Sequence, residues 1–366
     1  MILPFGYKAE SKRNMRKLII LIAVLAFVFP KAFGQIGGEN TYEFLNLTNS
    51  ARMAALGGNQ IAINDSTDLN VSYNNPSLLR PDMKNMLIVN YVDYFAGVNY
   101  GYAAYSFSTP LPGNFAIGMH YINYGKFIEA LENGEKTGAN FTAAEYALNL
   151  IWSHQYKRLM YGINLKPILS SYETYQSVGI AADLGVSLFS KNKHTVTSLV
   201  ARNIGTQITT YYDGAERESI PFDLQLGISQ KLQHAPIRLA ATMQHLQKWD
   251  LSQPKEVKTG TSVVITEDSF GNKLMRHLAL GVELLPSPNF TIRAGYNHQI
   301  RQELRLEEKM STVGFSWGFG FRISRFHINY GSARYHLAGS SSLISIALNL
   351  NEDFKRNVVR EEVVAE

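Results

Sequence analysis

The sequence contains no cysteine, and only 18% of its 366 residues are charged. The absence of cysteine excludes disulfide bonds, thiolate metal sites and thiol nucleophiles together. A run of about 20 apolar residues, which a transmembrane helix requires, occurs nowhere in the chain. The composition is nevertheless not that of a disordered protein, because 45% of the residues are hydrophobic.

The positive charge is confined to the start of the chain. The formal net charge is +5, and residues 1–34 alone contain six Lys or Arg against one acid, so the rest of the chain is neutral. A neutral body has no general electrostatic attraction to phosphate backbones. We therefore expect no nucleic-acid partner.

Residues 1–34 have the organisation of a secretory signal peptide. Two basic residues precede an apolar run over residues 18–29, and small residues follow this run. This order predicts cleavage between Gly34 and Gln35, with Met15 as a candidate true start. The mature protein is expected to be exported.

From residue 86 onward, apolar residues alternate with small or polar ones, which is typical of strands with two different faces. Residues 178–188 show it: Val, Ile, Ala, Leu, Val and Leu alternate with Gly, Ala, Asp, Gly and Ser. Most of the expected strands exceed the about 5–6 residues usual in globular proteins. We expect fourteen strands, over residues 86–94, 96–108, 114–124, 142–155, 158–170, 175–189, 194–204, 221–233, 236–247, 274–285, 290–300, 311–323, 325–334 and 342–350.

The expected connections alternate between short turns and mostly long loops. The long ones cover residues 125–141, 205–220, 248–273, 301–310 and 335–341. Outer-membrane barrels have short turns at one end and longer loops at the other, whereas a soluble sandwich has no reason for this asymmetry. We therefore predict an all-β fold, a 14-stranded antiparallel transmembrane β-barrel over residues 86–350. Both termini, including a tail over residues 351–366, are expected to be periplasmic.

The segment before the barrel, residues 35–85, does not alternate, and we interpret it as an N-terminal hatch or plug. It contains a short helix of small residues that ends at a glycine pair, and later a turn before a proline. Many expected lumen positions in the strands are glycine, which suggests a close approach of another backbone. We expect residues 40–80 to fill the barrel against this glycine-lined wall.

Two motifs in this segment carry a resemblance to a known family. They are Ala51, Arg52, Gly57 and Gly58 in the first motif, and Asn75 and Pro76 in the second. Together they resemble the hatch of FadL-type long-chain fatty-acid channels, and still more the PorV/PorQ group of Bacteroidetes type IX secretion proteins. Stretches at residues 35–45, 90–97, 201–207 and 314–323 strengthen the second resemblance. The resemblance implies a FadL-like barrel of fourteen strands in the bacterial outer membrane.

The same resemblance implies a non-enzymatic component of the type IX secretion system that anchors surface partners of its attachment complex. The implied partners are proteins resembling PorZ, PorU and PorV, besides outer-membrane lipid; the loops at 125–141, 205–220 and 248–273 would bind them. The alternative is a FadL-like passive channel for hydrophobic small molecules. A channel of that kind needs an apolar pocket, and the small, polar lumen face expected from the sequence favours the interaction role.

One set of motifs suggests an enzyme and has to be rejected. Ser190 and Lys193 have the S-x-x-K spacing of penicillin-binding proteins, and Lys-Thr-Gly triplets occur at 136–138 and 258–260. The expected barrel places Ser190 in a turn at one end and both triplets in loops at the other, so they cannot form one cleft. The nine histidines also lack the spacing of metal ligands. We expect no catalytic residues, no metal and no cofactor.

Overall fold

The computed structural model describes residues 40–94, 97–131, 133–252, 255–259, 262–266, 268–304, 312–336 and 339–351. The expected cleavage site between Gly34 and Gln35 and most of the expected C-terminal tail lie outside these residues. The fold described below belongs to the unit that begins at Asn40.

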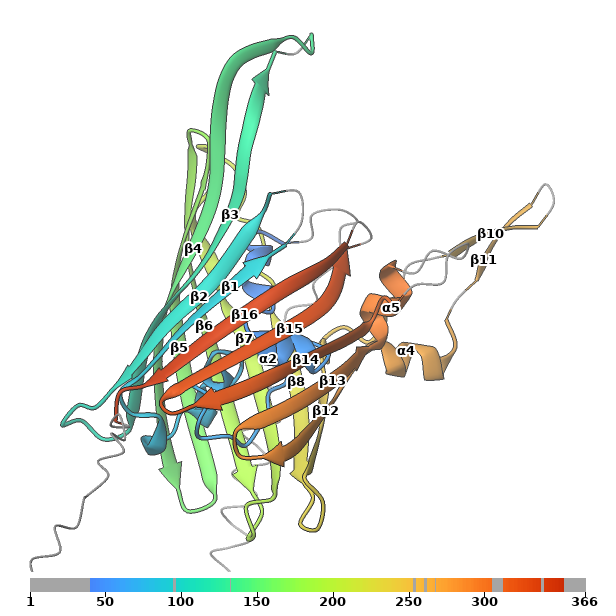
Figure 1. Ribbon diagram of the computed structural model, residues 1–366. Helices are drawn as coiled ribbons and strands as arrows, with labels where there is room; N and C mark the ends of the chain where they lie inside the picture. The colour runs from blue at the N-terminus through green and yellow to red at the C-terminus, as the bar shows by residue number, and fades with distance from the viewer. Residues whose placement is uncertain are drawn as a thin grey trace, which may run out of the picture. The chain divides into compact units, whose positions relative to one another are not determined.

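Fourteen antiparallel strands close into a barrel, which confirms the predicted fold class (Figure 1). The strands are β1 (Met86–Asp93), β2 (Asn99–Phe107), β3 (Asn114–Ala130), β4 (Lys136–Tyr156), β5 (Leu159–Tyr172), β6 (Tyr175–Phe189), β7 (Thr195–Thr209), β8 (Asp223–Lys231), β9 (Ile237–Met243), β12 (Leu278–Ser287), β13 (Phe290–Asn297), β14 (Phe315–Ile323), β15 (Phe326–His336) and β16 (Gly339–Asn349). Each strand pairs with its neighbour in the chain except that β9 pairs with β12, and β16 closes the ring on β1.

The remaining elements lie inside the barrel or in the connections. Before the first strand come η1 (Glu43–Asn46), α2 (Ala51–Ala55), α3 (Val71–Asn74), η2 (Pro76–Leu78) and η3 (Pro81–Met83). The link from β9 to β12 holds a hairpin of β10 (Lys255–Thr259) and β11 (Ser262–Thr266) and then α4 (Phe270–Arg276), and α5 (His298–Leu304) follows β13. None of the described helices is long and apolar enough to cross a membrane.

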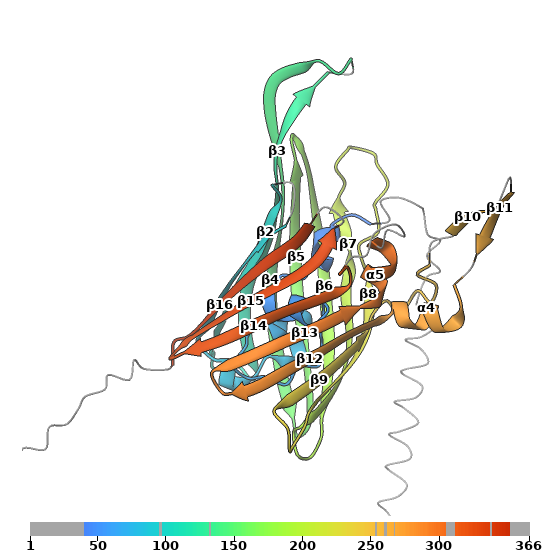
Figure 2. The ribbon, with the colours of Figure 1, turned by 45° about the vertical axis from the view of Figure 1, so that its right-hand side comes forward.

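The two ends of the barrel differ in their connections. The short-turn rim carries turns such as 157–158 and 324–325, and the long-loop rim carries 210–222, 244–277 and 298–314. The expected loop at 125–141 was wrong, because β3 and β4 continue their pairing to Ala130 and Lys136 beyond a register shift. A stacked pair of Phe127 and Phe141, with ring centroids 5.2 Å apart, stabilises this hairpin, which projects from the rim (Figure 2). The expected loop at 335–341 is also mostly strand.

The outward face of the strands is apolar, as the alternation predicts. Many of its members are between 40% and 49% exposed, among them Ile117, Met119, Leu150, Leu165, Val186, Leu199, Leu226 and Ile344. The alternate positions turn inward and carry buried serine, asparagine and glycine. A continuous apolar exterior around a polar inner face is stable in hydrocarbon rather than in water.

The wall of the barrel is uneven. The long wall, β3 to β7, has strands of 14 to 21 residues, whereas the short wall, β12 to β16, has strands of 8 to 11. The helices α4 and α5 belong to the connections of the short wall, and the projecting hairpin belongs to the long wall (Figure 2).

Residues 40–83, the inner segment, lie inside the barrel (Figure 1, blue). Its large apolar side chains are almost completely buried, among them Leu45, Met53, Leu56, Ile61, Ile63 and Leu69. Its backbone passes close to wall glycines, which is where the glycine pattern of the strands predicts it. A methyl group at Gly281 would lie 2.9 Å from Leu56, and one at Gly162 would lie 2.6 Å from Pro76.

Candidate functional site

Six charged side chains join the inner segment to the barrel wall, and we call them the charged anchor. Arg52, Asp65 and Asp68 come from the inner segment, and Arg238, Glu283 and Arg293 come from β9, β12 and β13. Three positive and three negative groups make the cluster neutral as a whole. All except Asp65 have less than 10% of their surface exposed.

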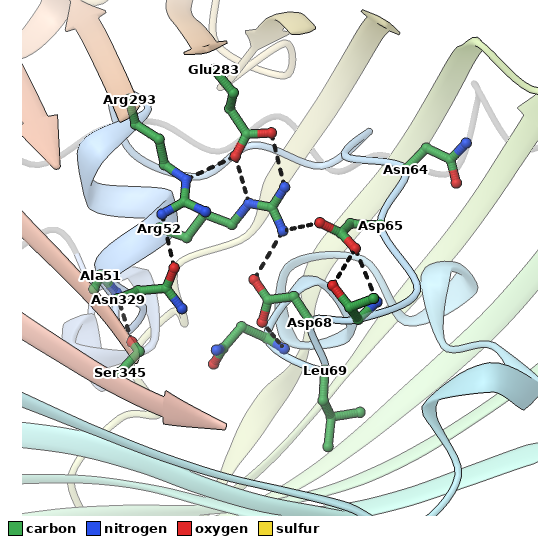
Figure 3. Close-up of polar contacts among 12 residues, drawn as sticks. Ala51, Arg52, Asn64, Asp65, Asp68, Leu69, Glu283, Arg293, Asn329 and Ser345 are labelled. Atoms are coloured by element: carbon green, nitrogen blue, oxygen red, sulfur yellow. Dashed lines mark hydrogen bonds and ion pairs between the residues drawn. The ribbon is translucent and has the colours of Figure 1, made fainter. Parts of the chain in front are cut away.

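Arg52 is the centre of this cluster (Figure 3). Its Nε and Nη2 donate to the two carboxylate oxygens of Glu283 at 2.8 and 2.9 Å, a bidentate pair. Its Nη1 donates to Asp65 at 2.8 Å and to Asp68 at 3.1 Å. One guanidinium therefore connects β12 with two points of the inner segment.

Glu283 is shared by three guanidinium groups. Besides Arg52, Arg293 Nε donates to it at 2.8 Å, and Arg238 donates to its other oxygen. Arg293 continues to Asn329 on β15 at 2.8 Å. Three wall strands and the inner segment thus meet at one buried carboxylate, and β15 is joined to them through Arg293.

The charges also determine the protonation of the inner segment. Burial alone would raise the pKa of Asp65, but Arg52 and Arg238 hold that pKa well below its usual value. The same attraction raises the pKa of Arg52 further, against the cost of its burial. Arg52 and Asp65 are therefore both ionised at neutral pH.

The helix α2 packs directly on the short wall, next to the charged anchor. Its seat is a row of wall glycines: a methyl group at Gly331 would lie 2.2 Å from Ala51 O, and one at Gly295 would lie 2.1 Å from Gly57 N. The backbone N–H groups of Ala51 and Gly57 donate to Ser345 and Ser316 at 2.9 and 3.1 Å. With a φ of +88°, Gly57 ends the helix in the left-handed region that favours glycine.

A second attachment, the neutral anchor, joins Asn75, Pro76 and Ser77 to β5 and β6 of the long wall. Asn75 Nδ2 donates to Ile61 O at 2.7 Å and to Ser187 Oγ at 3.0 Å, and its Oδ1 accepts from Ser77 N at 3.0 Å. The hydroxyl oxygens of Ser77 and Ser187 lie 2.7 Å apart. A methyl group at Gly185 would lie 2.3 Å from Asn75 Oδ1, so the wall needs glycine there.

The two hatch motifs singled out in the sequence therefore lie at different places. Ala51, Arg52 and Gly57 contact the short wall, and Gly58 lies beside them, with its added methyl 3.8 Å from Asn297. Asn75 and Pro76 contact the long wall. Between β14, on which α2 packs, and β5 there are six strands in either direction around the ring, so α2 and the neutral anchor lie on opposite sides. The strands of the charged anchor, β9, β12 and β13, lie nearer to β5 and β6.

The wall partners of Arg52 were not identified from the sequence. The available signal was a charged residue at an inward position of a strand, as at Glu283 and Arg293. A second missed pair is Lys166 and Asp183, 2.6 Å apart and buried on β5 and β6.

The residues of the rejected enzyme motif are far apart in the fold. Ser190 lies in the turn between β6 and β7 at the short-turn rim, and Lys136 begins β4 at the long-loop rim. Within the part of the chain that the structure describes, no three acidic or histidine side chains form a group that could hold a metal ion.

No family model and no curated protein matches the chain. Among solved structures it is similar to the "TodX deltaS2S3 mutant monoaromatic hydrocarbon channel", with a TM-score of 0.51 and 14% identity over 82% of this chain and 99% of that one. The Pseudomonas putida toluene transporter TodX gives a TM-score of 0.49 and 15% identity over 82% of this chain and 97% of that one. The CymD monoaromatic hydrocarbon channel gives a TM-score of 0.48 and 14% identity over 83% of this chain and 97% of that one. At such identities the likeness concerns the barrel fold alone.

Proposed function

We propose that the chain is an integral barrel of the bacterial outer membrane and acts as a gated, passive channel for small hydrophobic molecules. The inner segment is its plug, and the two anchors hold the plug in the closed position. The observation that carries this proposal is the apolar interior of the barrel, which the inner segment forms together with inward side chains of the wall.

The apolar interior comes from the inner segment. Its side chains form two buried clusters inside the barrel, in which Leu69 and Leu78 share one cluster with Tyr102 of β2 and Ile151 of β4. A small, polar lumen was expected from the sequence. The inward face of the wall has many such positions, but it also carries apolar side chains such as Ile88, Met160 and Val200. An apolar interior excludes ions and polar solutes, since their transfer from water has a high free-energy cost, and favours apolar ones.

The similar solved structure with a TM-score of 0.51 supports the same class of cargo. Its name describes that protein as a monoaromatic hydrocarbon channel. For this chain we therefore propose a small aromatic or aliphatic hydrocarbon, and no chemical step on it.

The first test measures uptake in the presence of an outer membrane, because hydrocarbons cross simple lipid vesicles unaided. A Gram-negative host without its own hydrocarbon channel expresses the protein, and uptake of radiolabelled toluene at limiting concentration is compared with that of an empty-vector strain. We expect faster uptake of toluene and unchanged uptake of a polar solute of similar size. Equal toluene uptake in both strains contradicts the channel.

The second test locks the plug. The chain has no cysteine, so Ser77→Cys with Ser187→Cys offers one disulfide between the inner segment and β6, at hydroxyls now 2.7 Å apart. Oxidation should reduce toluene uptake and reductant should restore it. The matched control is Ser187→Cys with Ser198→Cys, also 2.7 Å apart, which links β6 to β7 and leaves the plug free. An equal loss of toluene uptake in both variants contradicts a plug that moves during transport.

A second candidate function is the secretion role implied by the sequence resemblance, and the projecting hairpin of β3 and β4 favours it. Phe127, Ile128 and Leu131 of this hairpin are 41%, 55% and 55% exposed, and such exposed apolar groups suit a protein partner. Affinity isolation of the tagged protein from detergent-extracted membranes tests this role. A surface protein that is recovered with the native chain, and lost with Phe127→Ser and Ile128→Ser, would support it; recovery of lipid alone contradicts it.

A further inference from the structure

An exposed aromatic pair lies at the long-loop rim of the short wall. Trp249 is 46% exposed and Phe270 is 70% exposed, and their ring centroids are 5.6 Å apart. Trp249 belongs to the connection after β9, and Phe270 is the first residue of α4. Neither is on a barrel strand.

Buried and paired groups hold this pair in place. The ring of His277 stacks on Trp249 with centroids 5.3 Å apart, and its two nitrogens lie 2.7 and 3.0 Å from the carbonyl oxygens of Gln244 and Trp249. Lys273 of α4 pairs with Asp250 at 2.6 Å, next to Trp249 in the chain. The exposed rings therefore project from a fixed support.

The aromatic pair continues the lipid-facing surface. The chain passes from α4 through His277 directly into β12, whose outward side chains Leu280 and Val282 are 38% and 42% exposed. Both views place α4 beside that end of β12 and outside the barrel (Figures 1 and 2). The aromatic rings thus extend the apolar exterior beyond the rim.

We propose that Trp249 and Phe270 insert into the interfacial layer of the lipid leaflet at the long-loop rim and anchor the short wall there. Aromatic rings with polar neighbours are enriched at this depth of a bilayer, and the Lys273–Asp250 pair supplies polar groups that fit the headgroup region. Strands of 8 to 11 residues are only about as long as a crossing requires, so the short wall gains most from an added contact. The inference rests on the membrane location proposed above.

Single-tryptophan variants test it, since the chain has three tryptophans. Trp152→Phe with Trp317→Phe leaves Trp249 as the reporter. Trp152→Phe with Trp249→Phe leaves Trp317, which is 54% exposed on the outward face of β14. Each folded variant is reconstituted in vesicles whose acyl chains carry bromine close to the headgroup or close to the bilayer midplane.

We expect bromine near the headgroup to quench Trp249 more than bromine near the midplane does. Adding Phe270→Ser should weaken this quenching, while Gly271→Ala, where a methyl group would meet no atom within 4 Å, should not. If Trp317 is quenched and Trp249 is not, the proposed insertion of Trp249 and Phe270 is wrong, while the membrane location of the barrel is supported. If neither is quenched, the proposed membrane location itself fails. If Trp249 is shielded from acrylamide only after a protein partner is added, the proposed insertion into lipid is also wrong.

Discussion

The charged anchor and the neutral anchor fix the same inner segment to different strands of the barrel, and they differ in the forces that hold them. At the charged anchor, Arg52 and Glu283 are buried and depend on four further charged groups for neutrality. At the neutral anchor, Asn75 and Pro76 depend on hydrogen bonds and on a backbone approach that only glycine permits.

This difference determines how each anchor should respond to change. A buried ion pair adds little net stability over apolar packing, but removing one partner is costly because a charge remains without compensation. At a neutral contact, a substitution removes one hydrogen bond or adds one steric clash. Each such change lowers the stability of the contact by a limited amount. We expect the charged anchor to fail as a unit and the neutral anchor to weaken stepwise.

The variant with the largest expected effect is Glu283→Gln, which leaves three guanidinium groups facing two aspartates. Removing one partner of a buried pair costs about 3–5 kcal/mol. Labelling of a single cysteine at the buried position 53, made by Met53→Cys, measures opening at the charged anchor. Labelling at 53 should become at least ~100-fold faster. A cysteine at position 77, made by Ser77→Cys, should change less.

The control for this variant restores neutrality. Glu283→Gln combined with Arg293→Gln leaves two positive and two negative groups, so labelling at position 53 should slow again. If the double variant opens as fast as the single one, packing around Glu283 matters and charge balance does not.

At the neutral anchor, Gly185→Ala should have the next largest effect. Its methyl group would lie 2.3 Å from Asn75 Oδ1, and forcing extra volume into a packed site costs about 1–3 kcal/mol. Labelling at position 77 should accelerate more than labelling at position 53, the reverse of the pattern for Glu283→Gln. Gly271→Ala on α4 meets no atom within 4 Å and should leave both rates unchanged. Equal acceleration at both positions would mean that the anchors open together.

The strands could be predicted from the sequence because one rule applies to every strand of a barrel with an apolar exterior. Apolar side chains at alternate positions face outward, and the run over residues 178–188 lies entirely within β6, whose ends at Tyr175 and Phe189 match the expected ones. The rule does not apply beyond the barrel. The projecting part of the hairpin carries Gly125 and Gly138 with positive φ and does not alternate regularly, so it resembled a loop.

The anchors could be predicted only on the side of the inner segment. The motifs drew attention to Arg52 and Asn75, since both lie in short, irregular stretches. Their partners are inward residues of strands, and the ion pair of Arg52 with Glu283 spans 231 positions of the chain. That pairing depends on how the barrel closes and on how far the inner segment enters it. A local sequence pattern predicts neither of these.

A smaller effect is expected for Ser187→Ala, which removes one hydroxyl from the neutral anchor. In the labelled protein, which carries cysteine at position 77, Asn75 Nδ2 would lose its bond to Ser187 but retain the one to Ile61 O. One neutral hydrogen bond contributes about 1 kcal/mol, so labelling at position 77 should rise up to about tenfold. Ser153→Ala, on the inward face of β4 and bonded to Leu79 O, is the control outside the anchor. An equal rise at position 77 in that variant would show that any lost wall hydroxyl loosens the plug.

The smallest expected effect is a pH response confined to the charged anchor. Because Arg52 and Arg238 lower the pKa of Asp65 in the folded protein, this carboxylate stabilises the anchor above its unfolded pKa of about 3.9. That stabilisation is lost as the pH falls below about 4 toward the folded pKa, so labelling at position 53 should accelerate between pH 5 and pH 3. Position 77 should show no such step, because the hydrogen bonds of the neutral anchor around it, from Asn75 to Ile61 and Ser187, involve no titrating group. Rates are measured with a dipyridyl disulfide and divided by those of the unfolded chain at the same pH. In Asp65→Asn the acceleration at 53 should disappear; if it persists, a different carboxylate controls the anchor.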